Sequence, residues 1–494
     1  MALTIPVSEI VEKSSNPFLQ IHSSWKRVLL DDIAEILNGF AFKSNKFSKS
    51  KGFPLLRIRD IGREYTDCFY DGPYDPNYVI KPGDLVIGMD GDFNCSRWSG
   101  PEALLNQRVC KVTIVSNYYN PKFLDIALPG YLKAINEKTS SVTVKHLSSK
   151  SIVEIPLPLP PLPEQQRIVT KIEELFTNLD TGIKALKTVK TQLKRYRQAV
   201  LKYAFEGELT REWRELHKEE LEPALVLLER IKEEKMKNIK GKRRHKKLPL
   251  LDTYELPDGW IWVRTGDICE GIVPGRTKPK EFKGDIPWIT LPDVKGLYIS
   301  KSREKLAVTE EDANKVGMKV MPKGTVLMSC IGQFGIICIA KKQVVPNQQF
   351  HGFVCQNGII PEFLAYSLMS QVEQMEKLST ATTISYLNQS KCNNLAVPLP
   401  MHGEQQKIVE EIEQRFSIIK KIEKTVDTNL KKAERLHQSI LKKAFEGKLV
   451  PQNPNDEPAH ILLERIKAEK SKNNSKKSKK KEKYNQKRLI DYGK

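Results

Sequence analysis

The sequence lacks the features that mark most membrane proteins, metalloproteins and nucleotide-hydrolysing enzymes. No window of 18 or more apolar residues could serve as a transmembrane helix. The eight cysteines never fall two residues apart, so neither a zinc spacing nor a disulfide framework is indicated. No G-x-x-x-x-G-K-[ST] run is present, and the eight histidines are scattered. We therefore expect reduced cysteines in a cytoplasm, no membrane role and no metal or cofactor site in this chain.

What the sequence has is positive charge. Lysine and arginine outnumber aspartate and glutamate by 81 to 60, which gives a net charge of +21. Such an excess favours a polyanionic partner such as nucleic acid. Part of it lies in two polar runs, 237–247 and 470–488, which we expect to be mobile linker or tail. Solubility and two basic tails remain an alternative explanation for the charge.

A long internal repeat determines the architecture. Residues 164–210 align without a gap on 404–450 with 19 identities in 47, and the segment 222–237 returns at 457–472. Shared helical composition does not produce such agreement, so a unit of about 235 residues has been duplicated and fused. The sequence thus predicts a covalent dimer with internal pseudo-twofold symmetry.

Each half of the sequence predicts a mixed globular block followed by helices. Short β-rich runs broken by Gly, Pro and Asp turns indicate one α+β fold used twice, with two similar α/β-mixed domains separated by two long antiparallel coiled-coil helices. We expect seven segments in chain order: an N-terminal arm 1–24, a first block 25–160, a helical region 161–237, a basic linker 238–258, a second block 259–400, a helical region 401–472, and a basic C-terminal tail 473–494.

The long helices are expected over 164–206 and 404–446, each closed by a glycine. Apolar residues in steps of four and three form a heptad seam. The seam residues are Ile168, Ile172, Leu175, Leu179, Leu186 and Leu193 in the first helix, and Ile408, Ile412, Ile419, Val426, Leu436 and Ile440 in the second. Similar length favours pairing of the two copies with each other, although pairing with another chain stays open.

Two variable blocks, each with a proline-rich exit and a helix carrying EQQ-x-IV and AFEG, resemble one family over residues 25–472. It is the specificity subunit of bacterial and archaeal type I restriction-modification systems. The resemblance implies that each block is a target recognition domain for half of a split, asymmetric site in double-stranded DNA. It also implies two modification subunits that methylate adenine with S-adenosylmethionine, and restriction subunits that use ATP and Mg. The chain itself would be non-catalytic.

Most candidate DNA-binding residues lie in loops at matching depth in the two blocks, and Arg57 and Arg59 alternate with apolar residues on an expected strand. Arg, Lys, Asn and Gln side chains read base edges, and positive or amide donors bind phosphates. The candidates are Arg57, Arg59, Asn94, Arg97, Trp98, Arg108 and Lys145 in the first block, and Arg276, Thr277, Lys278, Gln333, Gln349, Ser385 and Tyr386 in the second. An ordinary hairpin tip, or an amide that satisfies turn backbone, is the alternative for the loop residues.

Two other functions remain open. A self-contained DNA methyltransferase or nuclease would need cofactor or metal motifs that the sequence does not display. A coiled-coil adaptor without sequence specificity would not need two blocks with different surface residues on a shared frame.

Overall fold

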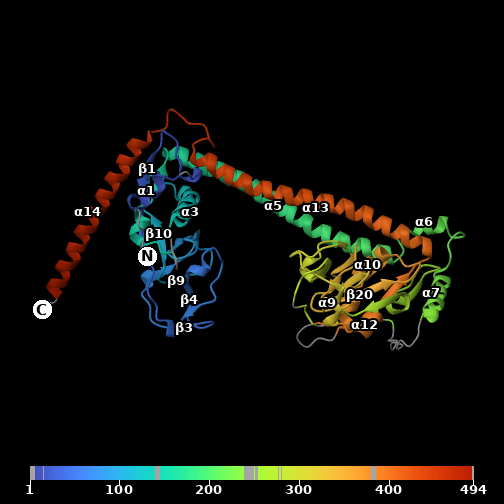
Figure 1. Ribbon diagram of the computed structural model, residues 1–494. Coiled ribbons are helices and arrows are strands. Elements are labelled where there is room, and N and C mark those ends of the chain that lie inside the picture. Colours follow the sequence, from blue (N-terminus) through green and yellow to red (C-terminus); the bar gives the residue numbers. More distant parts are fainter. Residues whose placement is uncertain are drawn as a thin grey trace. The chain divides into compact units, whose positions relative to one another are not determined.

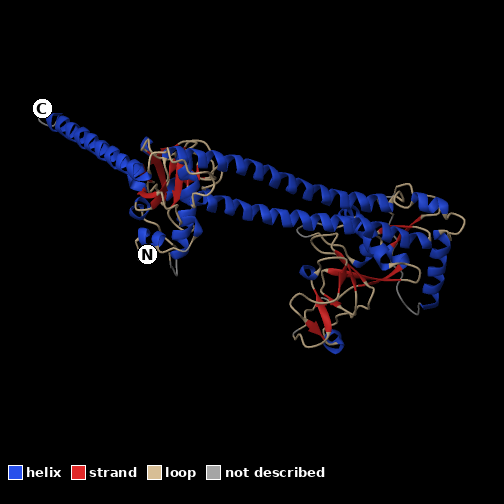
Figure 2. Cartoon of the chain, turned by 90° about the horizontal axis from the view of Figure 1, so that it is seen from above, coloured by secondary structure: helices blue, strands red, loops and turns tan. Residues whose placement is uncertain are grey.

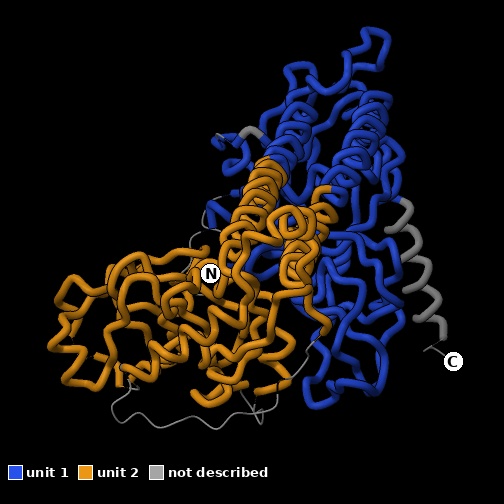
Figure 3. The backbone as a smooth tube through the Cα atoms, turned by 90° about the vertical axis from the view of Figure 1, so that its right-hand side faces the viewer, with its two compact units in different colours: residues 1–185, 429–494 blue, residues 186–428 orange. Residues whose placement is uncertain are grey.

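The computed structural model describes residues 6–14, 16–139, 145–238, 250, 254–275, 277–279, 281–379 and 385–491. The chain divides into two compact units, which Figure 3 colours separately. Unit 1 consists of residues 1–185 and 429–494, and unit 2 of residues 186–428. Each unit therefore combines one block with part of each long helix.

The first block, in unit 1, is built on a four-stranded antiparallel sheet with the order β2-β10-β7-β8. Strand β7 (Leu85–Gly88) is buried throughout, as a continuous apolar run predicts for a central strand. The other strands of this sheet are β2 (Ala34–Asn38), β8 (Cys95–Arg97) and β10 (Val109–Ile114). Helix α3 (Pro121–Lys138) begins at Asn120, whose side chain caps the first turn.

Smaller elements complete unit 1 (Figure 1). A five-stranded sheet has the order β3-β5-β4-β9-β6, and β1 pairs with β11. The bounds are β1 (Lys26–Leu29), β3 (Phe47–Ser48), β4 (Phe53–Leu56), β5 (Phe69–Tyr70), β6 (Val79–Ile80), β9 (Ala103–Leu105), β11 (Pro156–Leu159), α1 (Val7–Glu12), α2 (Leu30–Ile33), α4 (Ser149–Val153) and α14 (Ala459–Asp491).

The second block, in unit 2, repeats this plan. Its main sheet has the order β13-β20-β17-β18-β15, beside a three-stranded sheet β16-β14-β19 and the pair β12-β21. The strands are β12 (Ile261–Arg264), β13 (Cys269–Ile272), β14 (Ile286–Ile289), β15 (Tyr298–Ile299), β16 (Ala307–Val308), β17 (Val326–Ser329), β18 (Ile337–Ala340), β19 (Val345–Pro346), β20 (Phe350–Cys355) and β21 (Ala396–Leu399). The helices are α6 (Arg211–Leu216), α7 (Ala224–Asn238), α8 (Thr265–Ile268), α9 (Glu310–Lys315), α10 (Pro361–Ser370), α11 (Val372–Leu378) and α12 (Gln389–Asn393).

Two helices of equal length, α5 (Leu162–Phe205) and α13 (His402–Phe445), pass through both units. They lie side by side and antiparallel within each unit (Figure 2). In unit 1 the rings of Phe176 and His437 stack at 4.0 Å. In unit 2 the guanidinium of Arg197 lies 5.0 Å from the ring of Phe416. The repeat aligns these pairs with each other, so one packing arrangement is used twice.

The seam between the long helices differs from the predicted one at a single position. Leu436 is 52% exposed, so its assignment to the seam is wrong. His437 takes that place against Phe176. From Ala433, a step of three reaches Leu436 and a step of four reaches His437, and both steps fit a heptad. The prediction took Leu436 because it is the apolar one of the two. Of the other predicted seam residues, Leu175, Leu179 and Leu186 are half-buried, and the following are buried: Ile168, Ile172, Leu193, Ile408, Ile412, Ile419, Val426 and Ile440.

The end of each long helix turns back onto a block. Gly207 and Gly447 follow the helices with φ of 79° and 67°, the left-handed conformation that a glycine C-cap provides. Phe445 of α13 packs in the core of the first block, and Phe205 of α5 in that of the second. Each block is thus completed by the long helix that comes from the other half of the sequence.

Both termini differ from the expected arm and tail. Val7 and Leu19, in the segment expected to be an arm, are buried in the core of the first block. Helix α14 runs to Asp491, through most of the expected tail, where a lysine-rich run without Pro or Gly contains no helix breaker. In the described part of the chain, no helix combines the length and apolarity needed to cross a membrane.

Candidate nucleic-acid interface

Two sets of loops lie at corresponding edges of the main sheets. The first loop cluster comprises residues 89–94, 106–108 and 145–147, and the second comprises residues 330–335, 347–349 and 385–387. An isolated bridge joins Asp90 to His146 in the first, and another joins Ile331 to Tyr386 in the second. The sequence repeat does not extend to these side chains.

The same backbone hydrogen bonds hold both clusters. The amide of Gly91 donates to the carbonyl of Lys145 at 3.0 Å, and that of Gly332 donates to Ser385 at 2.8 Å. Both glycines have positive φ, 73° and 79°, which other residues adopt only with strain. The main chain is therefore shared, whereas the side chains on it are free to differ.

Each loop tip combines a buried aromatic side chain with an exposed amide side chain. Phe93 and Phe334 are buried in the cores of their blocks. Their neighbours Asn94 and Gln333, both predicted DNA-binding residues, are exposed. A buried aromatic ring beside an exposed amide fixes the loop while leaving a donor and an acceptor available to a ligand.

Three charged or polar side chains meet in the first cluster. The Nδ1 atom of His146 lies 2.6 Å from Oδ1 of Asp90. The Nε atom of Arg108 lies 3.6 Å from Oδ2 of Asp90, and its side chain is 53% exposed. The structure thus brings the predicted residue Arg108 together with an acidic partner that sequence reasoning missed. The sequence contained a signal for this residue. Asp90 aligns with Ile331 in the repeat, so a charged side chain stands in the first loop where the second has an apolar one.

The second cluster has neutral side chains in the same positions. Gln349 replaces Arg108, and its Oε1 accepts a hydrogen bond from Nδ2 of Asn347 at 3.0 Å. Tyr386 replaces His146 and is 37% exposed. Ser385 contributes its carbonyl to the loop. The two clusters therefore offer different chemistry on one backbone design.

Trp98 is not a DNA-reading residue. Its side chain is 1% exposed in a core cluster of the first block, and its Nε1 donates to the carbonyl of Pro101. The prediction is wrong because it assigned this ring to the surface from its position next to a glycine-bracketed loop. Burying the large apolar area of the ring stabilises the fold more than exposing it would.

Three predicted arginines lie elsewhere on the first block. Arg97 donates through Nε to Asp125 at 2.6 Å, and Arg57 forms ion pairs with Asp60 and Asp67. Carboxylates of the same block bind both guanidinium groups, and the contribution of Arg57 and Arg97 to DNA binding remains a prediction. Arg59 is exposed on the short helical turn Ile58–Asp60.

Lys145 is also bound within the protein. Its Nζ donates to the backbone oxygen of Asn136 at 2.6 Å and to Oδ1 of the same residue at 3.0 Å. The ammonium therefore ties the first loop cluster to the last turn of α3, and its contribution to DNA binding remains a prediction.

The predicted loop of the second block borders a polar cavity. Arg276 lies outside the described residues, while Thr277 and Lys278 are exposed. Lys278 lines a cavity of about 410 Å³ together with Thr290, Arg303, Asn347 and Gln348. This cavity adjoins the second loop cluster through the segment 347–348, and its lining also includes the carboxylates Asp293 and Glu304, so groups of both charges and amides meet there.

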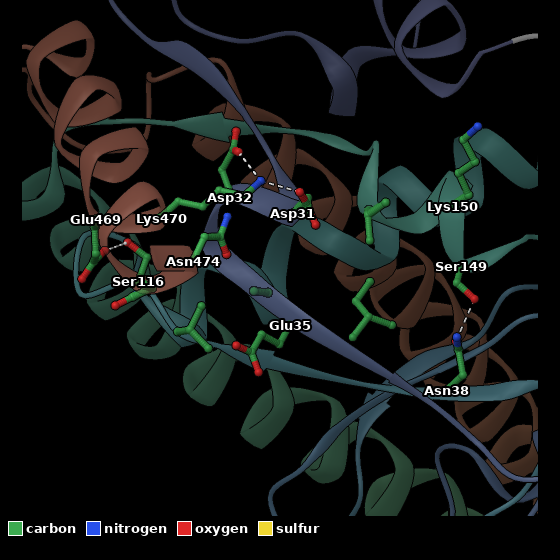
Figure 4. A pocket seen from close by; sticks show the side chains of 15 residues that line it. Asp31, Asp32, Glu35, Asn38, Ser116, Ser149, Lys150, Glu469, Lys470 and Asn474 are labelled. Atoms are coloured by element: carbon green, nitrogen blue, oxygen red, sulfur yellow. Dashed lines mark hydrogen bonds and ion pairs between the residues drawn. The ribbon is translucent and has the colours of Figure 1, made fainter. Parts of the chain in front are cut away.

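A second cavity, of about 550 Å³, lies where α14 packs on the first block (Figure 4). Nζ of Lys470 lies 2.8 Å from Oδ1 of Asp32, and Glu469 accepts from the hydroxyl of Ser116 at 2.6 Å. Both interactions join α14 to the block (Figure 4). The polar side chains beside this cavity therefore hold α14 on the first block.

The described residues contain no group of three or more His, Cys, Asp or Glu side chains placed to hold a metal ion. Burial raises the pKa of several thiols, that of Cys110 and that of Cys338 to about 12. Such thiols stay protonated and are poor nucleophiles.

Comparison with known proteins identifies the family. A family model described as the type I restriction modification DNA specificity domain matches residues 22–192 and, a second time, residues 257–432. The chain belongs to the type I restriction-modification specificity family. Each match covers one block together with much of the long helix that follows it, so the two blocks are two DNA specificity domains.

Similarity to individual relatives extends over nearly the whole chain. The specificity subunit of the type I restriction enzyme EcoBI from Escherichia coli is 36% identical over 97% of this chain and 100% of its own length. The EcoDI specificity subunit from Escherichia coli is 26% identical over 92% of this chain and 98% of its own. A solved chain from a study of assembly and conformational transition of a type I restriction-modification system aligns with a TM-score of 0.61. It is 20% identical and covers 87% of this chain and all of its own, which supports the shared fold.

Proposed function

We propose that this specificity subunit reads a bipartite, asymmetric site in double-stranded DNA and carries out no chemistry itself. The observation that supports the proposal is the pair of loop clusters, in which Gly91 and Gly332 hold matching backbones and Arg108 and Gln349 occupy matching positions. A common frame with different side chains is what two different half-sites require.

The physical basis is bivalent binding. Each block alone offers a small polar surface, and a net charge of +21 adds attraction to the phosphate backbone that is independent of sequence. Once one block is bound, the second contact becomes intramolecular, so two weak half-sites give one strong site. The continuous helices α5 and α13 connect the blocks and would set the gap between the half-sites.

The partners in this proposal are two modification subunits and, in the complete enzyme, restriction subunits. S-adenosylmethionine would belong to the modification subunits, and ATP and Mg to the restriction subunits. On the long helices in unit 2, Tyr196, Tyr203 and Ile418 are 51%, 54% and 52% exposed, and we propose them as contacts for a modification subunit.

Co-expression with the cognate modification subunit tests the proposal. We expect methylated adenines in a two-part motif with a fixed gap, mapped by single-molecule sequencing of the host DNA. The purified chain alone should transfer no methyl group. Methyl transfer by the isolated chain, or a complex that methylates without a sequence motif, would contradict the proposal.

A further inference from the structure

We propose that Arg108 reads a guanine in the half-site bound by the first block, and that Asp90 and His146 are positioning residues for its guanidinium. This inference rests on the proposed function, since it names the base that one loop cluster recognises. It assigns a role to three side chains that are distant in the sequence, since Asp90 lies 18 residues before Arg108 and His146 lies 38 residues after it.

The hydrogen-bond chemistry of the three residues leaves the outer edge of the guanidinium open. The 2.6 Å contact between Nδ1 of His146 and the carboxylate of Asp90 requires a proton on Nδ1, because the carboxylate only accepts. That protonated nitrogen cannot accept from Nη1 of Arg108, although the two atoms are 3.2 Å apart. Among the described residues, the guanidinium then has Asp90 as its ion-pair partner, on the Nε side at 3.6 Å.

The backbone at Arg108 is held in a conformation that costs energy. Its φ is 70°, and the only other non-glycine residues with positive φ in the described ranges are Phe93 and Lys305. Two of these three residues lie in the first loop cluster. Strained backbone of this kind persists where the surrounding structure enforces it, and it gathers at binding sites. Here it is held by the hydrogen bond from the amide of Met89 to the carbonyl of Arg108, at 2.8 Å.

The open edge of the guanidinium determines the base. Two parallel N–H groups match the N7 and O6 acceptors of guanine in the major groove, whereas adenine offers a donor in place of O6. Asp90 orients the group from behind without occupying both N–H groups. In the second cluster Gln349 stands at the matching position, and its oxygen is already bound to Asn347, so the same backbone cannot read guanine in this way.

The experiment uses the full chain assembled with its modification subunits. The bound motif is first determined by selection from random oligonucleotides. Each guanine of the two half-sites is then replaced by 7-deazaguanine, which lacks the N7 acceptor. We expect one guanine in the half-site of the first block at which the replacement weakens binding about tenfold or more. The Arg108→Ala complex should bind the DNA with guanine and the DNA with 7-deazaguanine equally, because alanine has no N–H group to donate to N7.

Two control variants separate the outcomes. Gln349→Ala should alter base preference only in the other half-site. Arg63→Ala, which removes an exposed arginine of the same block outside the cluster, should leave the motif unchanged. If Arg108→Ala weakens binding to all sequences alike and the motif persists, Arg108 contacts phosphate and the inference fails. If the wild-type complex selects no motif at all, the proposed function fails instead.

Asp90→Asn tests the positioning role while preserving side-chain shape. We expect discrimination between guanine and adenine at that position to fall several-fold, with binding to non-specific DNA and the unfolding temperature unchanged. A purely structural role for Asp90 would instead lower the unfolding temperature and weaken binding to every sequence, and that result would overturn the assignment.

Discussion

The two units can be compared at their buried glutamates, which begin the two long helices. In unit 1 the Nε1 atom of Trp25 donates to Glu164 at 3.1 Å, and in unit 2 Trp260 donates to Glu404 at 2.7 Å. Both carboxylates are almost completely buried. The repeat has thus preserved a junction that joins each block to its own helix.

The surroundings of the two carboxylates differ in charge. Glu404 forms a 2.7 Å ion pair with Arg214 and also accepts from the hydroxyl of Thr210. Glu164 accepts from Gln452, a neutral amide. Identical residues at repeated positions therefore have different electrostatic roles. The comparison teaches that the repeat conserves hydrogen-bond geometry, whereas charge has diverged both at this junction and in the loop clusters.

Removing each glutamate should give the largest difference in stability loss between the two units. Glu404→Ala leaves the largely buried guanidinium of Arg214 without its carboxylate, and we expect a loss of about 3 kcal/mol in the free energy of unfolding. Glu164→Ala leaves only neutral donors unsatisfied and should cost about 1–3 kcal/mol. Hydrogen exchange resolved along the chain would show each loss in its own unit. Equal losses would contradict the electrostatic difference.

A second pair of repeated residues, Lys235 and Lys470, attaches helices α7 and α14 to the blocks. Nζ of Lys235 donates to three backbone carbonyls, those of Gly266, Asp267 and Cys269, at 2.8–2.9 Å. Lys235→Met should therefore destabilise α7 by about 1–3 kcal/mol, because the carbonyls lose a shared donor. The measurement is the hydrogen-exchange protection of α7.

The matched variant Lys470→Met should have the smaller effect. Lys470 pairs with Asp31 and Asp32, and Asp31 is half exposed. Partly exposed ion pairs contribute about 0.2–1 kcal/mol, and salt screens them. We expect the loss of protection in α14 to disappear at high salt, whereas that in α7 should persist. A larger loss in α14 would reverse the assignment of roles.

The pH dependence of stability should also distinguish the units. Burial raises the pKa of Glu164, against the opposing hydrogen bonds from Gln452 and Trp25. An acid with a raised pKa in the folded state favours folding when protonated, so stability of unit 1 should fall as the pH rises from the ordinary glutamate value through the folded pKa. Glu164→Gln should flatten this part of the profile in urea unfolding. A wild-type profile that rises over this range would contradict the expectation.

The smallest expected effect concerns the seam. Leu436 is exposed, so Leu436→Lys should change the free energy of unfolding by no more than about 0.5 kcal/mol. Ala433→Lys, one turn earlier and buried, is the matched control and should be clearly destabilising. If Leu436→Lys is the more harmful of the two, the seam runs where the sequence placed it.

The long helices and the glycine loops, which occur in both copies of the repeat, could be predicted from the sequence. Two long helices with glycine caps follow from periodicity and from 19 identities in 47 aligned residues. The loop pair at Gly91 and Gly332 was found because glycine was retained for its positive φ. These features depend on local conformation, which a repeated local pattern reports directly.

The remaining features depend on contacts between distant residues. The proximity of Asp90, Arg108 and His146 arises from sheet pairing and strand order, which a pattern of single residues does not encode. Trp98 was misplaced for the same reason, since its burial depends on strands β6 and β9. His437 entered the seam because its partner Phe176 lies in the other long helix.

Site-directed crosslinking tests the central claim most directly. A photoreactive amino acid would replace Asn94 in one variant and Gln333 in another, both exposed at the tips of the loop clusters, within the complex bound to its selected DNA. The account predicts crosslinks to bases in opposite halves of the site, with the gap between them left unlabelled. Crosslinks from both positions to the same half, or from neither to DNA, would contradict it.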